Sequence, residues 1–144
     1  MTNFYLNTPT LDNYWRSIIL FGRNSASYKF AFAQSLIELA NDGKFNITLE
    51  ELAIPFSKHI VKHLELSPKQ GTAKTSKFLQ SCQNYIDNSI TNDELIDLTV
   101  RYGFINVIDA FHIVNNKEIP ERFFVYNRKQ NSNIQLTDNV FKLL

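Results

Sequence analysis

The sequence contains very little cysteine, glycine or proline. Cys82 is the single cysteine among 144 residues, so no internal disulfide can form and a reducing compartment is expected. Four glycines and four prolines argue against a collagen-like or low-complexity chain. No apolar run approaches the roughly 18 residues that span a bilayer. The N-terminal MTNFYLNTPT lacks the basic and apolar regions of a signal peptide. These features predict a soluble, cytoplasmic protein that makes no contact with a membrane.

The net charge of the chain is also small, at +1. This value argues against a protein that binds phosphates with its whole surface. The charges are nevertheless unevenly distributed: residues 55–80 hold five lysines against Glu65, and residues 87–109 hold five acids against Arg101. Two interpretations are open. A basic face meets DNA or an acidic partner, or, as is more common, two differently charged helices simply face solvent.

Large apolar side chains are plentiful, and 144 residues is a length typical of one domain. Thr10 is placed to cap a helix that begins at Leu11 and stops at Gly22. Ser25 is placed to cap a second helix, which ends at Asn41-Asp42-Gly43. We expect the two helices to form a hairpin whose core takes most of the aromatics in LDNYWRSIILFGRNSASYKFAFAQSL, residues 11–36.

Two capping boxes mark further helix starts, TLEE at 48–51 and TNDE at 91–94. The first helix is expected to kink or restart at Pro55 and to continue to about Leu66. Another helix is expected around 78–86, and the one opened by TNDE is expected to close at Gly103. INVIDAFHIV, residues 105–114, has the spacing of one more short helix.

The last part of the chain changes character. RFFVY (122–126) and NIQL (133–136) flank a turn-rich segment and predict a two-stranded hairpin. Thr137 or Asp138 then opens a helical segment that is expected to lack a partner, which suggests the front part of a longer protein. The predicted fold is mainly α: one compact multi-helix domain over 1–144, helical over 1–119, with a small C-terminal β-hairpin and the start of a helix over 120–144.

Several residue patterns suggest chemistry, but none completes a site. His59 and His63 have the i, i+4 spacing of a zinc-binding helix, without the glutamate of the protease motif, and packed or half-exposed histidines are the favoured interpretation. GTAKTSK (71–77) resembles a phosphate-binding loop without its full pattern. Asp109 and His112 are spaced to pair, yet no nucleophile accompanies them. We therefore predict no active site, no catalytic residue and no metal or other cofactor in this chain.

The best candidates for a binding surface are basic. Arg23 and Asn24 lie in the expected turn between the first two helices, with Lys29 one turn further on. A guanidinium and an amide in a turn can meet a phosphate or a base edge, although an asparagine there also suits a plain solvated loop. The candidate nucleic-acid contacts are Arg23, Asn24, Lys29, Lys74, Lys77, Arg122, Arg128 and Lys129.

Four segments carry a family resemblance: LDNYWRSIILFGRNSASYKFAFAQSLIELA, ITLEELAIPFSKHI, GFINVIDAFHIV and IPERFFVY. Together they resemble the amino-terminal region of bacterial HNH-type endonuclease proteins associated with restriction and phage defence. In that family the nuclease lies in a later segment, where histidines and an asparagine hold a divalent metal. Nothing here matches that element, so the resemblance implies a role in DNA cleavage by a larger protein and transfers no catalytic residue.

Two functions therefore compete. The first is a DNA-engaging or target-reading domain, in which the predicted hairpin with Arg128 and Lys129 near its tip acts like the wing of a winged helix. The second is a protein-interaction domain that docks the nuclease to a partner or to itself. The small net charge favours the second, and the basic hairpin tip and the basic 69–77 loop favour the first.

Overall fold

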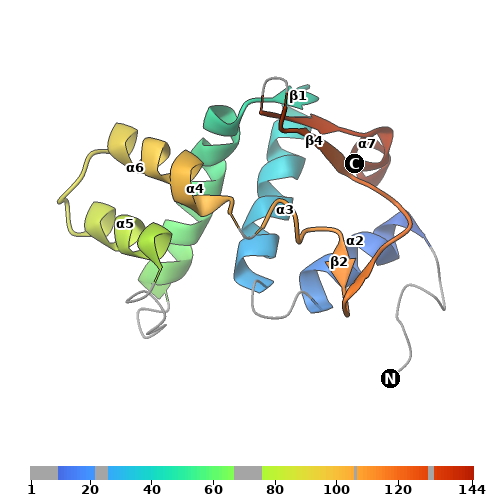
Figure 1. The fold of residues 1–144 in the computed structure, drawn as a ribbon, viewed down its shortest axis with the longest axis horizontal. Coiled ribbons are helices and arrows are strands. Elements are labelled where there is room, and N and C mark those ends of the chain that lie inside the picture. Colours follow the sequence, from blue (N-terminus) through green and yellow to red (C-terminus); the bar gives the residue numbers. More distant parts are fainter. Residues whose placement is uncertain (1–9, 22–25, 67–75, 106, 130–131) are drawn as a thin grey trace.

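The computed structural model describes residues 10–21, 26–66, 76–105, 107–129 and 132–144 (Figure 1). Its helices are α2 (Leu11–Phe21), α3 (Ala26–Asn41), α4 (Leu49–Leu66), α5 (Lys77–Ile86), α6 (Asn92–Leu98) and α7 (Asp138–Leu143), with a π-helical turn η2 (Thr99–Gly103) after α6. The strands are β1 (Asn46–Ile47), β2 (Ile113–Val114), β3 (Lys117–Glu118), β4 (Phe124–Asn127) and β5 (Asn133–Leu136). The fold is mainly α with a small C-terminal hairpin, as predicted. Among the described helices, none combines the length and apolarity that crossing a bilayer requires.

Local sequence signals set the helix starts. In the first capping box, the N–H of Glu51 donates to Oγ1 of Thr48 at 3.0 Å and the N–H of Thr48 donates to the Glu51 carboxylate at 3.0 Å. The second box, at Thr91 and Glu94, has the same reciprocal bonds. Both capping boxes are thus confirmed. Oγ1 of Thr10 accepts the N–H of Asn13, which confirms that cap too. The predicted cap at Ser25 lies outside the described residues.

The predicted restart at Pro55 is wrong, because α4 runs through this residue as one helix from Leu49 to Leu66. An interior proline costs a helix about 3 kcal/mol, since it removes a hydrogen bond and crowds the preceding turn. Buried Leu52 and Ala53 before Pro55, and buried Phe56 and Ile60 after it, pack into the same core. Burying side chains on both sides of the proline offsets its local cost, so one helix persists.

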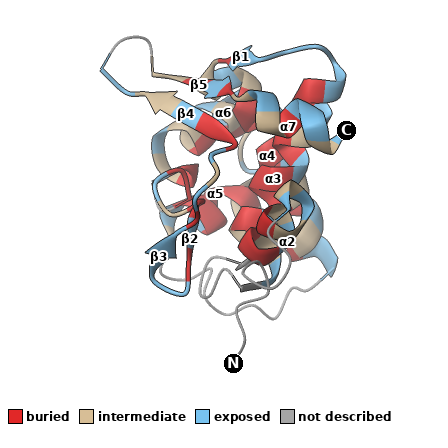
Figure 2. Ribbon diagram, turned by 90° about the vertical axis from the view of Figure 1, so that its right-hand side faces the viewer, coloured by how far each residue is buried: buried red, intermediate tan, exposed pale blue. Residues whose placement is uncertain are grey.

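Aromatic rings from α4, from the turns after η2 and from β4 meet at Phe32, which is fully buried. Its ring centroid lies 5.3 Å from those of Phe111 and Phe124, 6.0 Å from that of Phe56 and 6.2 Å from that of Phe104. Figure 2 shows the buried sides of α2, α3 and α4 turned toward this interior. One hydrophobic core therefore joins α3 and α4 to the later half of the chain.

The aromatics of α2 and α3 are used differently from the predicted hairpin core. Trp15 packs edge-on against Phe111 and Phe123, at 5.6 and 4.8 Å between centroids. Tyr28 packs instead against Phe56 and Phe78. These rings are core residues, but their partners come from later segments. Phe30 is the exception among the described aromatics of this stretch, with 53% of its surface exposed.

The helix predicted over 105–114 is wrong, although the residues it was expected to bury are buried. Its described residues form turns that lead into β2, which pairs antiparallel with β3. Asn115 and Asn116 link the two strands with φ values of 53° and 68°, a left-handed pair that suits a two-residue hairpin turn. Val107, Ile108 and Phe111 are buried as an amphipathic helix would have them, which is why their spacing looked helical.

The predicted C-terminal hairpin is confirmed as the antiparallel pair β4–β5. A third strand, which the sequence did not suggest, joins it: β1 pairs with β5, placing Asn46 opposite Gln135 and Ile47 opposite Ile134. The stretch over 1–119, predicted as helical, therefore also contains β1 and the β2–β3 pair.

Helix α7 has the partner that the sequence analysis expected it to lack. It packs against α2 and α3 and buries Val140 completely. Thr137 stands at the N-cap position, as predicted, yet its hydroxyl donates to the carbonyl of Arg122 at 2.6 Å instead of accepting from the first turn of α7. Tertiary packing therefore stabilises a helix too short to persist alone.

Candidate nucleic-acid interface

Three of the predicted nucleic-acid contacts lie together beside β4, around an open hollow of about 640 Å³. The residues that line this hairpin hollow include Asp109, Arg122, Tyr126, Asn127, Arg128 and Lys129. The side chains of Arg122 and Arg128 are 44% and 62% exposed. Guanidinium groups, an ammonium group, a phenol ring and an amide thus face solvent in one place, which is a combination that nucleic-acid surfaces use.

Arg128 is held by an acid and an aromatic ring. Its Nη2 lies 2.8 and 2.9 Å from the two carboxylate oxygens of Asp109, and its guanidinium carbon lies 5.1 Å from the centre of the Tyr126 ring. The hydrogen bond and negative charge of Asp109 raise the pKa of Arg128 above its ordinary value. Asp109 therefore fixes this guanidinium over Tyr126 and also competes with any phosphate for it.

Arg122 has a mainly structural set of bonds. Its Nη1 donates to Glu118 at 2.8 Å, and its Nε donates to the carbonyl of Phe124 at 3.2 Å. Its own carbonyl accepts from the hydroxyl of Thr137 and from Nδ2 of Asn139. Arg122 thereby ties β3, β4 and the start of α7 together, while part of its guanidinium remains exposed.

Lys129 completes the hairpin hollow from an exposed position. Among the described residues it has no ion pair, whereas Arg122 and Arg128 are each paired with one carboxylate. The three cations, Arg122, Arg128 and Lys129, against the two carboxylates, Glu118 and Asp109, leave a local net charge of +1. The hollow is therefore only weakly basic, and Lys129 is the cation most available to a phosphate.

Lys29 does not belong to a binding surface, and its prediction was wrong. It is only 2% exposed, and its Nζ donates to the carbonyl of Ile113 at 2.7 Å. Burial lowers the pKa of Lys29, because the charged form loses its hydration. The amine instead fastens α3 to the start of β2, and the long stem of the side chain fills the space between them.

The remaining predicted contacts do not join the hairpin hollow. Lys77 is the exposed first residue of α5, with its Nζ 5.3 Å from the centre of the Tyr102 ring, and it does not line the hollow. Arg23, Asn24 and Lys74 lie outside the described residues, as does most of the predicted phosphate loop. At the end of that loop, Ser76 caps α5 by accepting the N–H of Leu79 at 3.2 Å.

His112 and Asp109 are not a pair, which corrects another prediction. Asp109 binds Arg128, and His112 is buried among aromatic rings, where its Nε2 accepts the N–H of Phe123 at 2.9 Å. Burial, assisted by the charges of Arg122 and Lys29, lowers the pKa of His112 from 6.5 to about 3. This histidine is a neutral structural acceptor.

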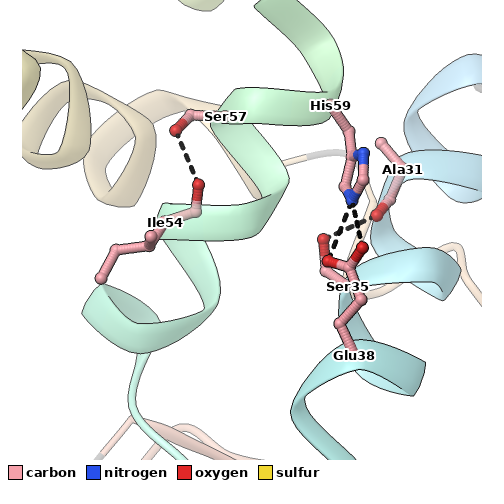
Figure 3. A network of polar contacts seen from close by, with 6 residues as sticks. All are labelled: Ala31, Ser35, Glu38, Ile54, Ser57 and His59. Atoms are coloured by element: carbon pink, nitrogen blue, oxygen red, sulfur yellow. Dashed lines mark hydrogen bonds and ion pairs between the residues drawn. The ribbon is translucent and has the colours of Figure 1, made fainter.

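His59 also has a structural contact, shown in Figure 3. Its Nε2 lies 3.0 and 3.2 Å from the two carboxylate oxygens of Glu38, so the pair connects α4 to α3. Within the described ranges, no cluster of three or more histidine, cysteine or acidic side chains is placed to hold a metal ion. Burial raises the pKa of Cys82 to about 12, which leaves its thiol protonated and unreactive.

A second hollowed surface runs along α3 and α4, and the His59–Glu38 pair lies within it. One end, the apolar end, measures about 650 Å³ and is lined by Ile19, Phe30, Gln34, Lys62, His63 and Leu66, among others. The other, the charged end, measures about 570 Å³ and includes Glu38, Asp42, Lys44, Glu51, Ile54 and Lys58. His59 lines both ends. We call this surface the α3–α4 groove.

Sequence reasoning missed Tyr126, Asn127 and Asp109 as members of the hairpin hollow. The first two stand directly beside Arg128 in the run YNRK, so a search for aromatics between basic residues would have found them. Asp109 carried no such signal, because it meets Arg128 across 19 positions of sequence.

Comparison with known proteins finds no match to this chain among family models, curated proteins or solved structures.

Proposed function

We propose that this chain is the DNA-engaging domain of an HNH-type DNA endonuclease of bacterial restriction or phage defence, with no active site of its own. The hairpin hollow is its contact surface. Arg128 and Lys129 contact phosphates, and Tyr126 and Asn127 lie where an unpaired base or a sugar would meet them. The nuclease and its divalent metal belong to another part of the protein.

The observation that supports this proposal most is the convergence of Arg122, Arg128 and Lys129 on one solvent-facing hollow next to an aromatic ring. Affinity for nucleic acid comes chiefly from such cations, through displacement of counterions from phosphates. The weak local charge implies modest affinity that falls steeply with salt. A hairpin of this kind also suits a wing that lies along a DNA backbone.

The first test is a fluorescence-anisotropy titration of the 144-residue chain against labelled duplex and single-stranded DNA at low and physiological salt. We expect the double variant Arg128→Ala/Lys129→Ala to weaken binding about tenfold at low salt. The slope of log K against log salt should fall by about two, one for each lost phosphate contact. The control Arg101→Ala/Lys142→Ala removes the same charge from exposed residues that line neither the hollow nor the α3–α4 groove, and it should bind like the parent. Equal losses in both variants would contradict a defined contact surface.

A second variant separates a binding role of Arg128 from a structural one. Asp109→Asn removes the carboxylate that competes with phosphate for the guanidinium. We therefore expect tighter DNA binding, with a salt slope steeper by about one. If Arg128 serves only to hold the β4–β5 pair against residue 109, Asp109→Asn will lower thermal stability and leave DNA affinity unchanged.

A protein-docking domain is the second candidate function, and the α3–α4 groove favours it. Phe30 and Leu66 in its apolar end are 53% and 76% exposed, and Ile54 in its charged end is 45% exposed. Large apolar side chains gathered at a hollow are typical of interaction surfaces. This groove and the hairpin hollow share no lining residue, so the two functions can be tested separately.

A further inference from the structure

The α3–α4 groove is a long surface between two antiparallel helices. At its apolar end, Phe30 near the start of α3 lies with Leu66 at the end of α4. At its charged end, Asp42 just after α3 lies with Glu51 near the start of α4. Twelve residues separate Phe30 from Asp42, which corresponds to about 18 Å along a helix. The groove therefore offers about three helical turns of contact.

The two sides of the groove carry opposite charge. On the α4 side, Lys58 and Lys62 line the groove and also line the hollow between α4 and α5–α6, so they stand on the outer crest of α4. On the α3 side stand Gln34, Glu38 and Asp42. The charged end also holds Lys44, just after α3, and Glu51, in the first turn of α4, but these two form an ion pair at 2.7 Å within one copy. The remaining charges make the α4 side basic and the α3 side acidic.

We propose that the α3–α4 groove is a self-association surface, on which a second copy of this chain docks through a two-fold axis parallel to the helices. That axis places α3 of one copy over α4 of the other and keeps each end of the groove over the same end of its partner. Phe30 and Leu66 then meet apolar side chains, and Lys58 meets the acidic Glu38 and Asp42 side. Because one patch serves both copies, the interface closes at a dimer.

Other two-fold arrangements fit less well. An axis in the interface plane but perpendicular to the helices places the apolar end over the charged end, which sets Phe30 against Asp42 and Leu66 against Glu51 of the other copy. The parallel axis satisfies both the apolar and the charge pattern. This inference specifies the partner for the docking function and is independent of the DNA-engaging function, which uses the hairpin hollow.

The test is sedimentation velocity of the full chain over a concentration series, with light scattering for mass. We expect the mass to shift reversibly from 16.7 kDa toward twice that value as the concentration rises. The dissociation constant should be about 10–100 µM, which is typical of a weak, transient protein–protein contact. Phe30→Asp should weaken self-association at least about tenfold, because it places a charge in the apolar contact. Leu20→Asp is the matched control, since Leu20 is 65% exposed and does not line the groove.

Charge reversal tests the orientation. Lys58→Glu and Asp42→Lys should each weaken the dimer several-fold, and the double variant should recover most of the loss, because the cross-copy pairs are restored with opposite sign. Both residues lie in exposed positions, so these variants keep the test valid if Phe30→Asp does not fold. A chain that stays at 16.7 kDa throughout the series would overturn the proposal, even if it binds DNA. So would a dimer that Phe30→Asp leaves intact.

Discussion

Replacing Phe32 by alanine is expected to lower the free energy of unfolding by about 3–5 kcal/mol. Phe32 is fully buried, and its ring meets the rings of Phe56, Phe104, Phe111 and Phe124. Those partners come from α4, from the turns after η2 and from β4, so they cannot all shift to fill the space that the ring leaves. Urea denaturation followed by circular dichroism measures the change.

The matched control for this variant is Phe30→Ala, only two positions away on α3. Phe30 is 53% exposed, so its truncation should cost less than about 1 kcal/mol. A similar cost for the two variants would mean that the ring cluster around Phe32 can collapse into the space, and would remove Phe32 from the centre of the core. A loss of DNA binding by Phe32→Ala at full stability would likewise contradict its assignment as a core residue.

Stability is expected to fall as the pH drops below 6.5, because of His112. The pKa of this side chain is about 3 in the folded protein and 6.5 in the unfolded chain. At a pH between these two pKa values, the unfolded state binds a proton that the folded state does not bind, so lowering the pH favours unfolding. The slope should be about 0.7 kcal/mol per pH unit at pH 6.5 and approach about 1.4 kcal/mol per unit near pH 5, so the free energy of unfolding should fall by about 2 kcal/mol between pH 6.5 and 4.5. Denaturation curves at stepped pH measure this slope.

His112→Gln identifies the source of the slope. Glutamine keeps an oxygen that can accept the N–H of Phe123 but does not titrate, so the variant should be nearly flat between pH 6.5 and 5. An unchanged slope in His112→Gln would assign the acid sensitivity to other groups.

Much of the helical framework was predictable because its signals are local. A capping box is complete within four residues, and the reciprocal bonds of Thr48 with Glu51 need no other part of the chain. The turn-rich segment after RFFVY likewise places β4 and β5 side by side through neighbouring residues. The partners in such features are only a few residues apart in the chain, so the sequence alone identifies them.

The predictions that failed each depended on a distant partner. Pro55 stays inside α4 because the core takes residues on both sides of it. Strand β1 exists because β5 lies beside it, which pairs Asn46 with Gln135, 89 positions later. Lys29 looked like a surface cation until the carbonyl of Ile113 was placed next to it. Helical spacing over 105–114 reported burial correctly but not backbone conformation, since turns can bury the same residues.

The candidate surfaces divide in the same way. Sequence placed Arg128 and Lys129 near a hairpin tip, but only the fold brings Asp109 against Arg128 and so decides how basic the hairpin hollow is. The α3–α4 groove had no sequence signal, because its lining alternates between two helices and Phe30 reads as one more core aromatic. By itself the sequence determined where helices begin and which residues are apolar enough to pack. Tertiary structure decided which charges pair and which apolar side chains stay exposed, since both depend on contacts between residues far apart in the chain.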